Sequence, residues 1–136
     1  MKNLIISVCL IAGLSGCSSL NVSPTSNLQS EVICIVTNTY ANADFTAVFL
    51  NEIRSNGYKA KFIDEGQESE CVITTTYFAA YNGAIYGKYL SQARLKVFKN
   101  NIKIGQAEYR TSKANLFKYG AQGTIASMVD ELFPQI

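Results

Sequence analysis

The stretch YLSQARLKVFKNNIKIGQAEYR, residues 89–110, decides the fold because it holds two strands and the turn between them. The apolar residues of its first half alternate with polar ones: Tyr89, Ala93, Leu95 and Val97. This alternation predicts a strand with one face in a core. Asn100 and Asn101 predict a tight turn, because asparagine tolerates the positive φ that two-residue hairpins need.

The register of this hairpin requires an irregularity. If Lys99 pairs with Ile102, Val97 meets Ile104, but Leu95 would then face Gln106 and lose its apolar partner. A bulge at Gly105 removes the conflict. The predicted pairs are then Leu95 with Ala107, Arg94 with Glu108 and Ala93 with Tyr109.

The flanking segments extend this hairpin into a sheet with two helices. β-Branched, aromatic and alternating residues predict strands over 32–39, 58–65 and 71–81, with an acidic loop at 65–70. Apolar residues at helical spacing predict a helix that begins at Asn42 or Asp44 and ends at Gly57. A second helix is predicted after an N-cap at Thr124, with GAQG (120–123) before it as a loop. Its apolar residues are Ile125, Met128, Val129, Leu132 and Phe133, and Pro134 ends it.

The resulting order is β-α-β-β-β-β-α. We expect one α+β domain of two layers over residues 32–136, in which an antiparallel-rich sheet carries both helices on one face. The first strand is almost continuously apolar, so we expect it to be central and covered on both faces.

The N-terminus has the pattern of an export signal. Lys2 is followed by an apolar run from Leu4 to Leu14, which is too short to span a bilayer but suits a signal-peptide core. The residues that follow, Leu14-Ser15-Gly16-Cys17, resemble the lipobox of bacterial lipoproteins. The resemblance implies a signal peptide over 1–16 and a lipid on Cys17, with diacylglycerol and usually an acyl chain such as palmitate. Ser18, which stands where aspartate favours inner-membrane retention, favours the periplasmic side of the outer membrane.

Removal of residues 1–16 would leave 120 of the 136 residues, with 11 basic and 10 acidic side chains. This length suits one modest core. The charge balance favours neither nucleic-acid binding nor a strongly charged surface. Residues 17–31 are rich in serine and asparagine, and we expect the lipidated cysteine to be followed by a flexible tether.

Cys34 and Cys71 remain in the exported domain. Cysteines of exported proteins usually pair, so we expect a disulfide between them, joining two strands or a strand and a neighbouring turn. Two separate buried thiols are the alternative. A metal site has less support, because the chain has no histidine and neither cysteine has a CxxC partner.

The sequence contains little that indicates catalysis. Without histidine, Ser-His-Asp and Cys-His nucleophiles are excluded. Glu65, Glu68 and Glu70 lie on a polar loop that is typical of a solvated surface. We therefore expect a protein that is not an enzyme and needs no cofactor.

Four tyrosines crowd around Asn82-Gly83: Tyr77, Tyr81, Tyr86 and Tyr89. Tyrosine is favoured at recognition surfaces, and glycine at 83 and 87 lets the loop adapt. We expect Tyr81 and Tyr86 to be exposed and to bind a partner, with Tyr77 deeper and Tyr89 on the apolar face. The alternative is that these tyrosines pack on the sheet.

The segments YLSQARLKVFKNNIKIGQAEYR and KYGAQGTIASMVDELF resemble the C-terminal half of small enterobacterial envelope lipoproteins, some carried on prophages and associated with envelope stress. The resemblance implies a lipid-anchored module that binds or supports an envelope protein of unknown identity. The alternative function is an immunity or phage-exclusion lipoprotein that neutralises a toxin or phage protein at the membrane.

Overall fold

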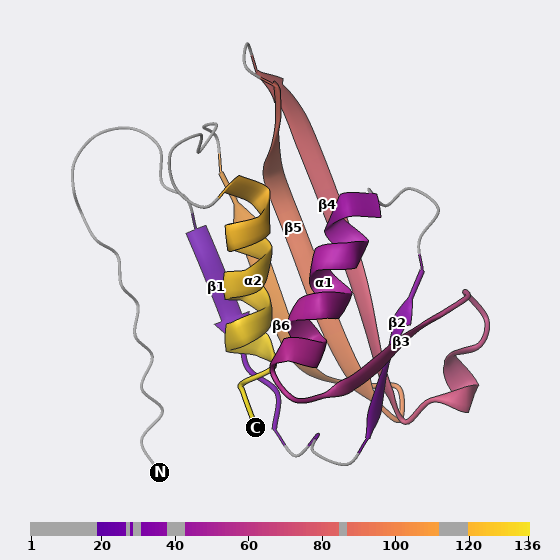
Figure 1. Ribbon diagram of the computed structural model, residues 1–136. Helices are drawn as coiled ribbons and strands as arrows, with labels where there is room; N and C mark the ends of the chain where they lie inside the picture. Colours follow the sequence, from indigo (N-terminus) through magenta and orange to yellow (C-terminus); the bar gives the residue numbers. More distant parts are fainter. Residues whose placement is uncertain (1–18, 27, 29–30, 38–42, 85–86, 112–119) are drawn as a thin grey trace.

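The chain folds into two layers, a six-stranded sheet and two helices that cover one of its faces (Figure 1). The computed structural model describes residues 19–26, 28, 31–37, 43–84, 87–111 and 120–136. The strands are β1 (Ser19–Ser23), β2 (Val32–Val36), β3 (Lys59–Ile63), β4 (Ile73–Ala84), β5 (Gly87–Lys99) and β6 (Ile102–Arg110). The helices are α1 (Ala43–Ser55) and α2 (Gly120–Leu132), and the 3-10 turn η1 (Glu68–Glu70) precedes β4. The α+β class is therefore confirmed.

The sheet is mixed, with strand order β1-β6-β5-β4-β2-β3. β1, β6, β5 and β4 pair antiparallel, whereas β2 runs parallel to both β3 and β4. The parallel part follows from the β2-α1-β3 crossover, since a helical connection returns the chain to the same end of the sheet. β2 is thus an inner strand, as its apolar composition predicts.

The hairpin of β5 and β6 has all but one of the predicted pairs. Lys99 faces Ile102, Leu95 faces Ala107, Arg94 faces Glu108 and Ala93 faces Tyr109. The turn residues Asn100 and Asn101 have φ of 50° and 65°. The bulge, however, lies one residue earlier than predicted.

At the bulge, Val97 pairs with Gly105 and Ile104 is the extra residue, so the predicted pairing of Val97 with Ile104 is wrong. The reason is steric. A Cβ at Gly105 would lie 2.5 Å from the Thr25 methyl carbon, closer than side chains approach one another. The buried position opposite Val97 therefore accepts glycine and not isoleucine.

A second irregularity reverses the predicted side of Tyr89. Ala80 pairs with Gln92 but Tyr81 pairs with Leu90, so Ser91 is an extra residue, and its hydroxyl donates to the Ala80 carbonyl at 3.0 Å. Beyond this bulge Leu90 is the buried residue. Tyr89 pairs with Asn82 and lies on the sheet face away from the helices, which corrects the prediction that it joins the apolar face.

Within the segment predicted as a flexible tether, the described residues 19–26 and 28 are instead part of the fold. β1 pairs along its length with β6, and its Leu20 and Val22 pack against the core. Thr25 and Leu28 are also buried. The error arose because the two apolar residues of SLNVS are too few to indicate a strand until β6 supplies a partner edge.

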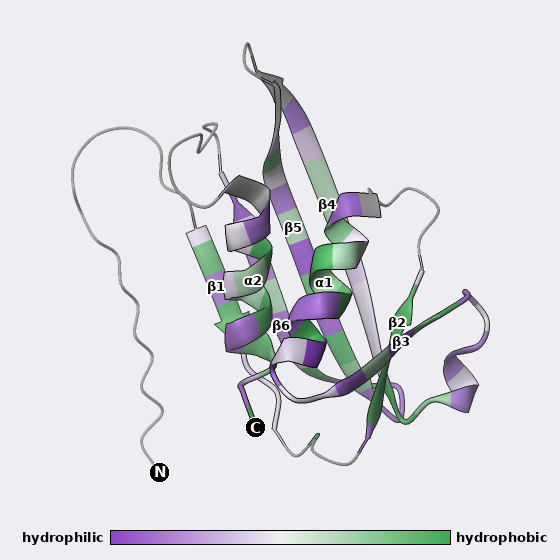
Figure 2. Ribbon diagram, in the orientation of Figure 1, coloured by the Kyte–Doolittle hydropathy of each residue, from purple (hydrophilic) through white to green (hydrophobic). Residues whose placement is uncertain are grey.

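Both helices bury the predicted apolar residues in the core, and Figure 2 shows hydrophobic residues recurring along each helix. In α1 these are Phe45, Phe49 and Ile53, and in α2 and the residue after it they are Ile125, Met128, Val129, Leu132 and Phe133. Gly57 adopts φ of 99° after α1, in agreement with the predicted stop. α2 begins at Gly120, so Thr124 lies inside the helix and the predicted cap and loop are wrong. The earlier start has a physical reason: once the packed turns of α2 have formed, each residue added at its N-terminal end gains a backbone hydrogen bond.

Candidate partner-binding sites

A disulfide joins Cys34 to Cys71, as the sequence predicts. Cys34 is in β2, and Cys71 lies between η1 and β4, so the bridge ties a strand to a neighbouring turn. Cys34 is buried with Val36 and Ile63 on the sheet face away from the helices, and Cys71 packs against them. The bridge and its loop therefore cover β2 on the face that the helices leave open.

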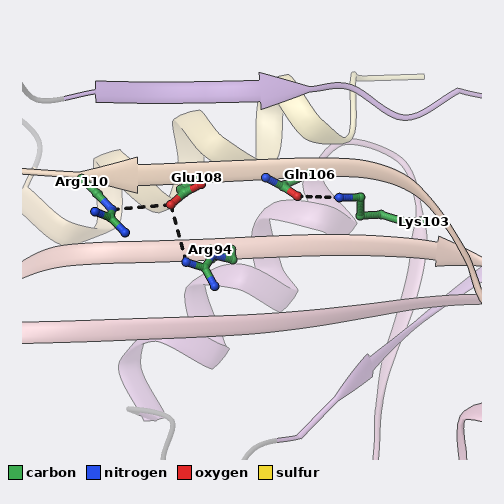
Figure 3. Close-up of polar contacts among 5 residues, drawn as sticks. All are labelled: Arg94, Lys103, Gln106, Glu108 and Arg110. Carbon is green, nitrogen blue, oxygen red and sulfur yellow. Dashed lines mark hydrogen bonds and ion pairs between the residues drawn. The ribbon is translucent and has the colours of Figure 1, made fainter.

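The middle of this outer face is polar along β5 and β6. Figure 3 shows Glu108 between two cations, with its Oε1 3.6 Å from Arg94 and 3.5 Å from Arg110. These side chains are partly or largely exposed, and exposed ion pairs contribute about 0–1 kcal/mol. The three residues form a solvated face in which the carboxylate offsets the cations.

The predicted tyrosine site is only partly exposed. Tyr77 is buried between Phe45 and Phe49, in agreement with the expectation that it lies deep. Tyr81 is half-buried and packs against the same core, and burial, followed by the charge of Asp44, raises the pKa of its hydroxyl. Tyr81 is therefore not the freely exposed contact that was expected. Tyr86 lies outside the described residues, as does the predicted lipid site Cys17.

A second group of exposed side chains lies at the end of the sheet away from Tyr81 and Asn82. It was not predicted from the sequence. Val32 and Val72 precede the paired residues Ile33 and Ile73, so they lie side by side. The Val72 carbonyl accepts a hydrogen bond from the N–H of Asn100 at 2.9 Å, which places the turn before Ile102 beside them. Ile73 pairs with Lys99 and Lys99 with Ile102, so Ile102 is on the face of the sheet that Ile73 shares, whereas the two valines are on the other face. We call Val32, Val72 and Ile102, which lie at this end of the sheet, the distal cluster.

The distal cluster is exposed despite its apolar composition. Ile102 is 69% exposed, and the two valines are 38% and 39% exposed. Exposed apolar side chains near one another at one end of a sheet are a candidate interaction surface. The only signal in the sequence is an isoleucine directly after a polar turn, where hairpins usually carry polar residues.

Among the residues that the structure describes, no group of three or more acidic or cysteine side chains could hold a metal ion. Within the same residues, no helix is long and apolar enough to cross a membrane.

The arrangement of six strands and two helices is one that solved structures share. No family model matches the chain, and no curated protein matches it. A variant of PelC from Paraburkholderia phytofirmans, described as a dodecamer, superposes with a TM-score of 0.62 at 12% identity, covering 83% of this chain and 96% of that one. A second PelC dodecamer from the same organism gives 0.54 at 11% identity, with 85% and 92% covered. At these identities the likeness shows the fold alone.

Proposed function

We propose that this protein is a lipid-anchored protein of the cell envelope that binds or supports another envelope protein without catalysis. The observation that carries the proposal is the Cys34–Cys71 disulfide. Disulfides persist in exported proteins and are rare in the reducing cytosol. The bridge therefore supports the same export route as the Leu14-Ser15-Gly16-Cys17 motif.

The distal cluster supports the binding part of the proposal. Its three aliphatic side chains offer apolar area and no chemical reactivity, which suits a docking surface. The PelC neighbours are dodecamers, and self-association of this kind is one form that envelope support would take. A second copy of the chain is therefore included among the partners that the experiment can detect.

The anchor is tested by replacing Cys17 with Ser in cells. We expect the wild-type protein to fractionate with outer membranes, whereas Cys17→Ser remains uncleaved at this position and carries no lipid. A processed Cys17→Ser protein that still fractionates with membranes would contradict the anchor.

Binding is tested by placing a photo-crosslinking amino acid at position 102 in the native envelope. The control position is Glu131, which is exposed on α2. We expect position 102 to capture an envelope protein, or a second copy, that position 131 does not capture. Equal capture at both positions, or none, would contradict a role for the distal cluster.

A further inference from the structure

The lipid site and the fold are separated by very little chain. β1 begins at Ser19, so only Ser18 stands between Cys17 and the sheet. Two residues of extended chain reach at most about 7 Å. A bilayer that holds the lipid on Cys17 must therefore lie close to the first residue of β1.

The β4–β5 hairpin projects past this point. Ser19 pairs with Arg110, Arg110 with Gln92 and Gln92 with Ala80, so these residues form one row across the sheet. From that row β4 continues by four residues to Ala84. At about 3.3 Å per residue this projection is about 13 Å, which exceeds the reach of the chain to Cys17. Figure 1 shows the hairpin extending beyond the start of β1 and of both helices.

We call residues 81–84 and 87–90 the arm. Among the described strands, we compare two that could meet a bilayer held this close: the arm, which projects past the row, and β1, which adjoins the proposed anchor. The residues of β1 are Ser-Leu-Asn-Val-Ser, and its two apolar side chains face the core. The arm carries Tyr81, Tyr89 and Lys88, and no acidic residue occurs between Glu70 and Glu108.

This composition fits phospholipid headgroups. Tyrosine concentrates at the level of the headgroups, where its ring and hydroxyl are both accommodated. An anionic leaflet attracts basic residues, and an arm without carboxylates meets no repulsion from phosphate. Tyr89 and Asn82 lie on the open face of the sheet, where no helix covers them.

We infer that the arm rests on the membrane, with Tyr89 at headgroup level, and that the sheet stands with the distal cluster away from the bilayer. The inference depends on the proposed lipid on Cys17. It assigns Tyr89, which pairs with Asn82, to a lipid surface and leaves the distal cluster for the protein partner.

Because the chain has no tryptophan, single substitutions supply unique fluorescent reporters. Tyr89→Trp and Asn82→Trp report on the arm, Asn21→Trp on the edge of β1, and Ile102→Trp on the distal end. Each lipidated full-length variant is reconstituted in vesicles of phosphatidylethanolamine and phosphatidylglycerol, with or without a nitroxide-labelled headgroup. Flotation checks the anchor, and thermal melting checks that each variant is folded.

We expect the nitroxide to reduce the emission of the two arm reporters by about twofold, as for an indole in the interfacial belt, and to leave Ile102→Trp unchanged. If the protein floats with the vesicles but neither arm reporter is quenched, the inference is overturned and the lipid anchor is retained. Quenching of Asn21→Trp in place of the arm reporters, or equal quenching at all positions, also overturns it. Protein that does not float overturns the lipid anchor and this inference with it.

Discussion

Thr25 donates two hydrogen bonds to the carbonyl oxygen of Leu132, from its N–H at 3.0 Å and from its hydroxyl at 2.7 Å. Leu132 is the last residue of α2, whose final carbonyls have no partner within the helix. A residue from the start of the domain thus caps the helix at its end. Residues 19–25 are therefore fastened at both β6 and α2, which leaves little chain between the fold and the proposed lipid site.

The close approach of Thr25 to Gly105 gives the first prediction. Gly105→Ala places a Cβ 2.5 Å from the Thr25 methyl carbon and 3.2 Å from a Leu132 side-chain carbon. Overpacking of this kind costs about 1–3 kcal/mol, and we expect the free energy of unfolding in urea to fall by that amount.

Thr25→Ser is the matched test, because it removes the methyl group and keeps the hydroxyl that bonds to Leu132. We expect the double variant Gly105→Ala with Thr25→Ser to recover part of the loss, as contacting residues are not additive. Strictly additive losses would show that the methyl group is not what excludes a side chain at position 105.

The second prediction concerns the disulfide. Replacing Cys34 and Cys71 together by Ser opens a covalent loop with a sequence separation of 37. For a loop of this size the chain-entropy model gives about 4 kcal/mol, so the double variant should unfold at lower denaturant concentration. The native protein should resist alkylation until it is reduced. Two thiols that react without reduction would contradict the bridge.

The third prediction is a pH dependence at the contact between α1 and α2. The pKa of the Glu52 carboxyl is raised from its ordinary value of 4.5. The largest cause is a side-chain hydrogen bond with Asp130, followed by burial and then by charge repulsion from Asp130. Asp130 also accepts a hydrogen bond from the Asn56 amide at 2.9 Å, which holds its position. Glu52 therefore binds its proton more tightly when the protein is folded.

As pH rises above the ordinary pKa of 4.5, the carboxyl loses its proton more readily in the unfolded chain than in the folded protein. The free energy of unfolding therefore falls between this value and the raised pKa of the folded protein. Glu52→Gln should remove this loss, so the variant should exceed the wild type in melting temperature at neutral pH. The difference should shrink as pH falls below that window. Glu131→Gln, on the exposed side of α2, is the control. A difference between Glu52→Gln and wild type that is constant with pH would contradict the coupling.

The fourth prediction tests whether Tyr81 contributes to the packing of the core. Tyr81 packs against the core, so Tyr81→Ser should lower the free energy of unfolding by about 1–2 kcal/mol through lost apolar burial. Phe78→Ser, at a side chain 46% exposed on the other face of β4, should cost less. Equal costs for the two variants in denaturant titration would show that Tyr81 is no better packed than Phe78.

The fifth prediction concerns the distal cluster. Ile102→Lys changes a side chain that is 69% exposed, so stability should stay within about 0.5 kcal/mol of the wild type. Affinity for the partner captured at position 102 should fall by about tenfold, which corresponds to about 1.4 kcal/mol. Phe62→Lys, at an exposed apolar position on the edge strand β3, is the control. An equal loss of affinity in both variants would indicate a general effect of charge.

Periodic patterns determined the central part of this fold. The alternation of Leu95 and Val97, the Asn100-Asn101 turn and the helical spacing of Phe45, Phe49 and Ile53 depend on neighbours that are close in the sequence. Such patterns indicate which side of each element is buried, so the class, the hairpin pairs and the core of both helices could be predicted. The cysteines could be paired because only Cys34 and Cys71 lie outside the predicted signal peptide and lipid site.

Contacts between distant segments decided the rest. β1 is a strand because β6 offers it an edge, and Gly105 carries no side chain because Thr25 lies against it. Ser91 is extruded by the pairing of β4 with β5, which turns Tyr89 to the other face. Each of these outcomes depends on an interaction between residues far apart in the chain. No local pattern encodes such contacts, because their free energy exists only when both partners are in place.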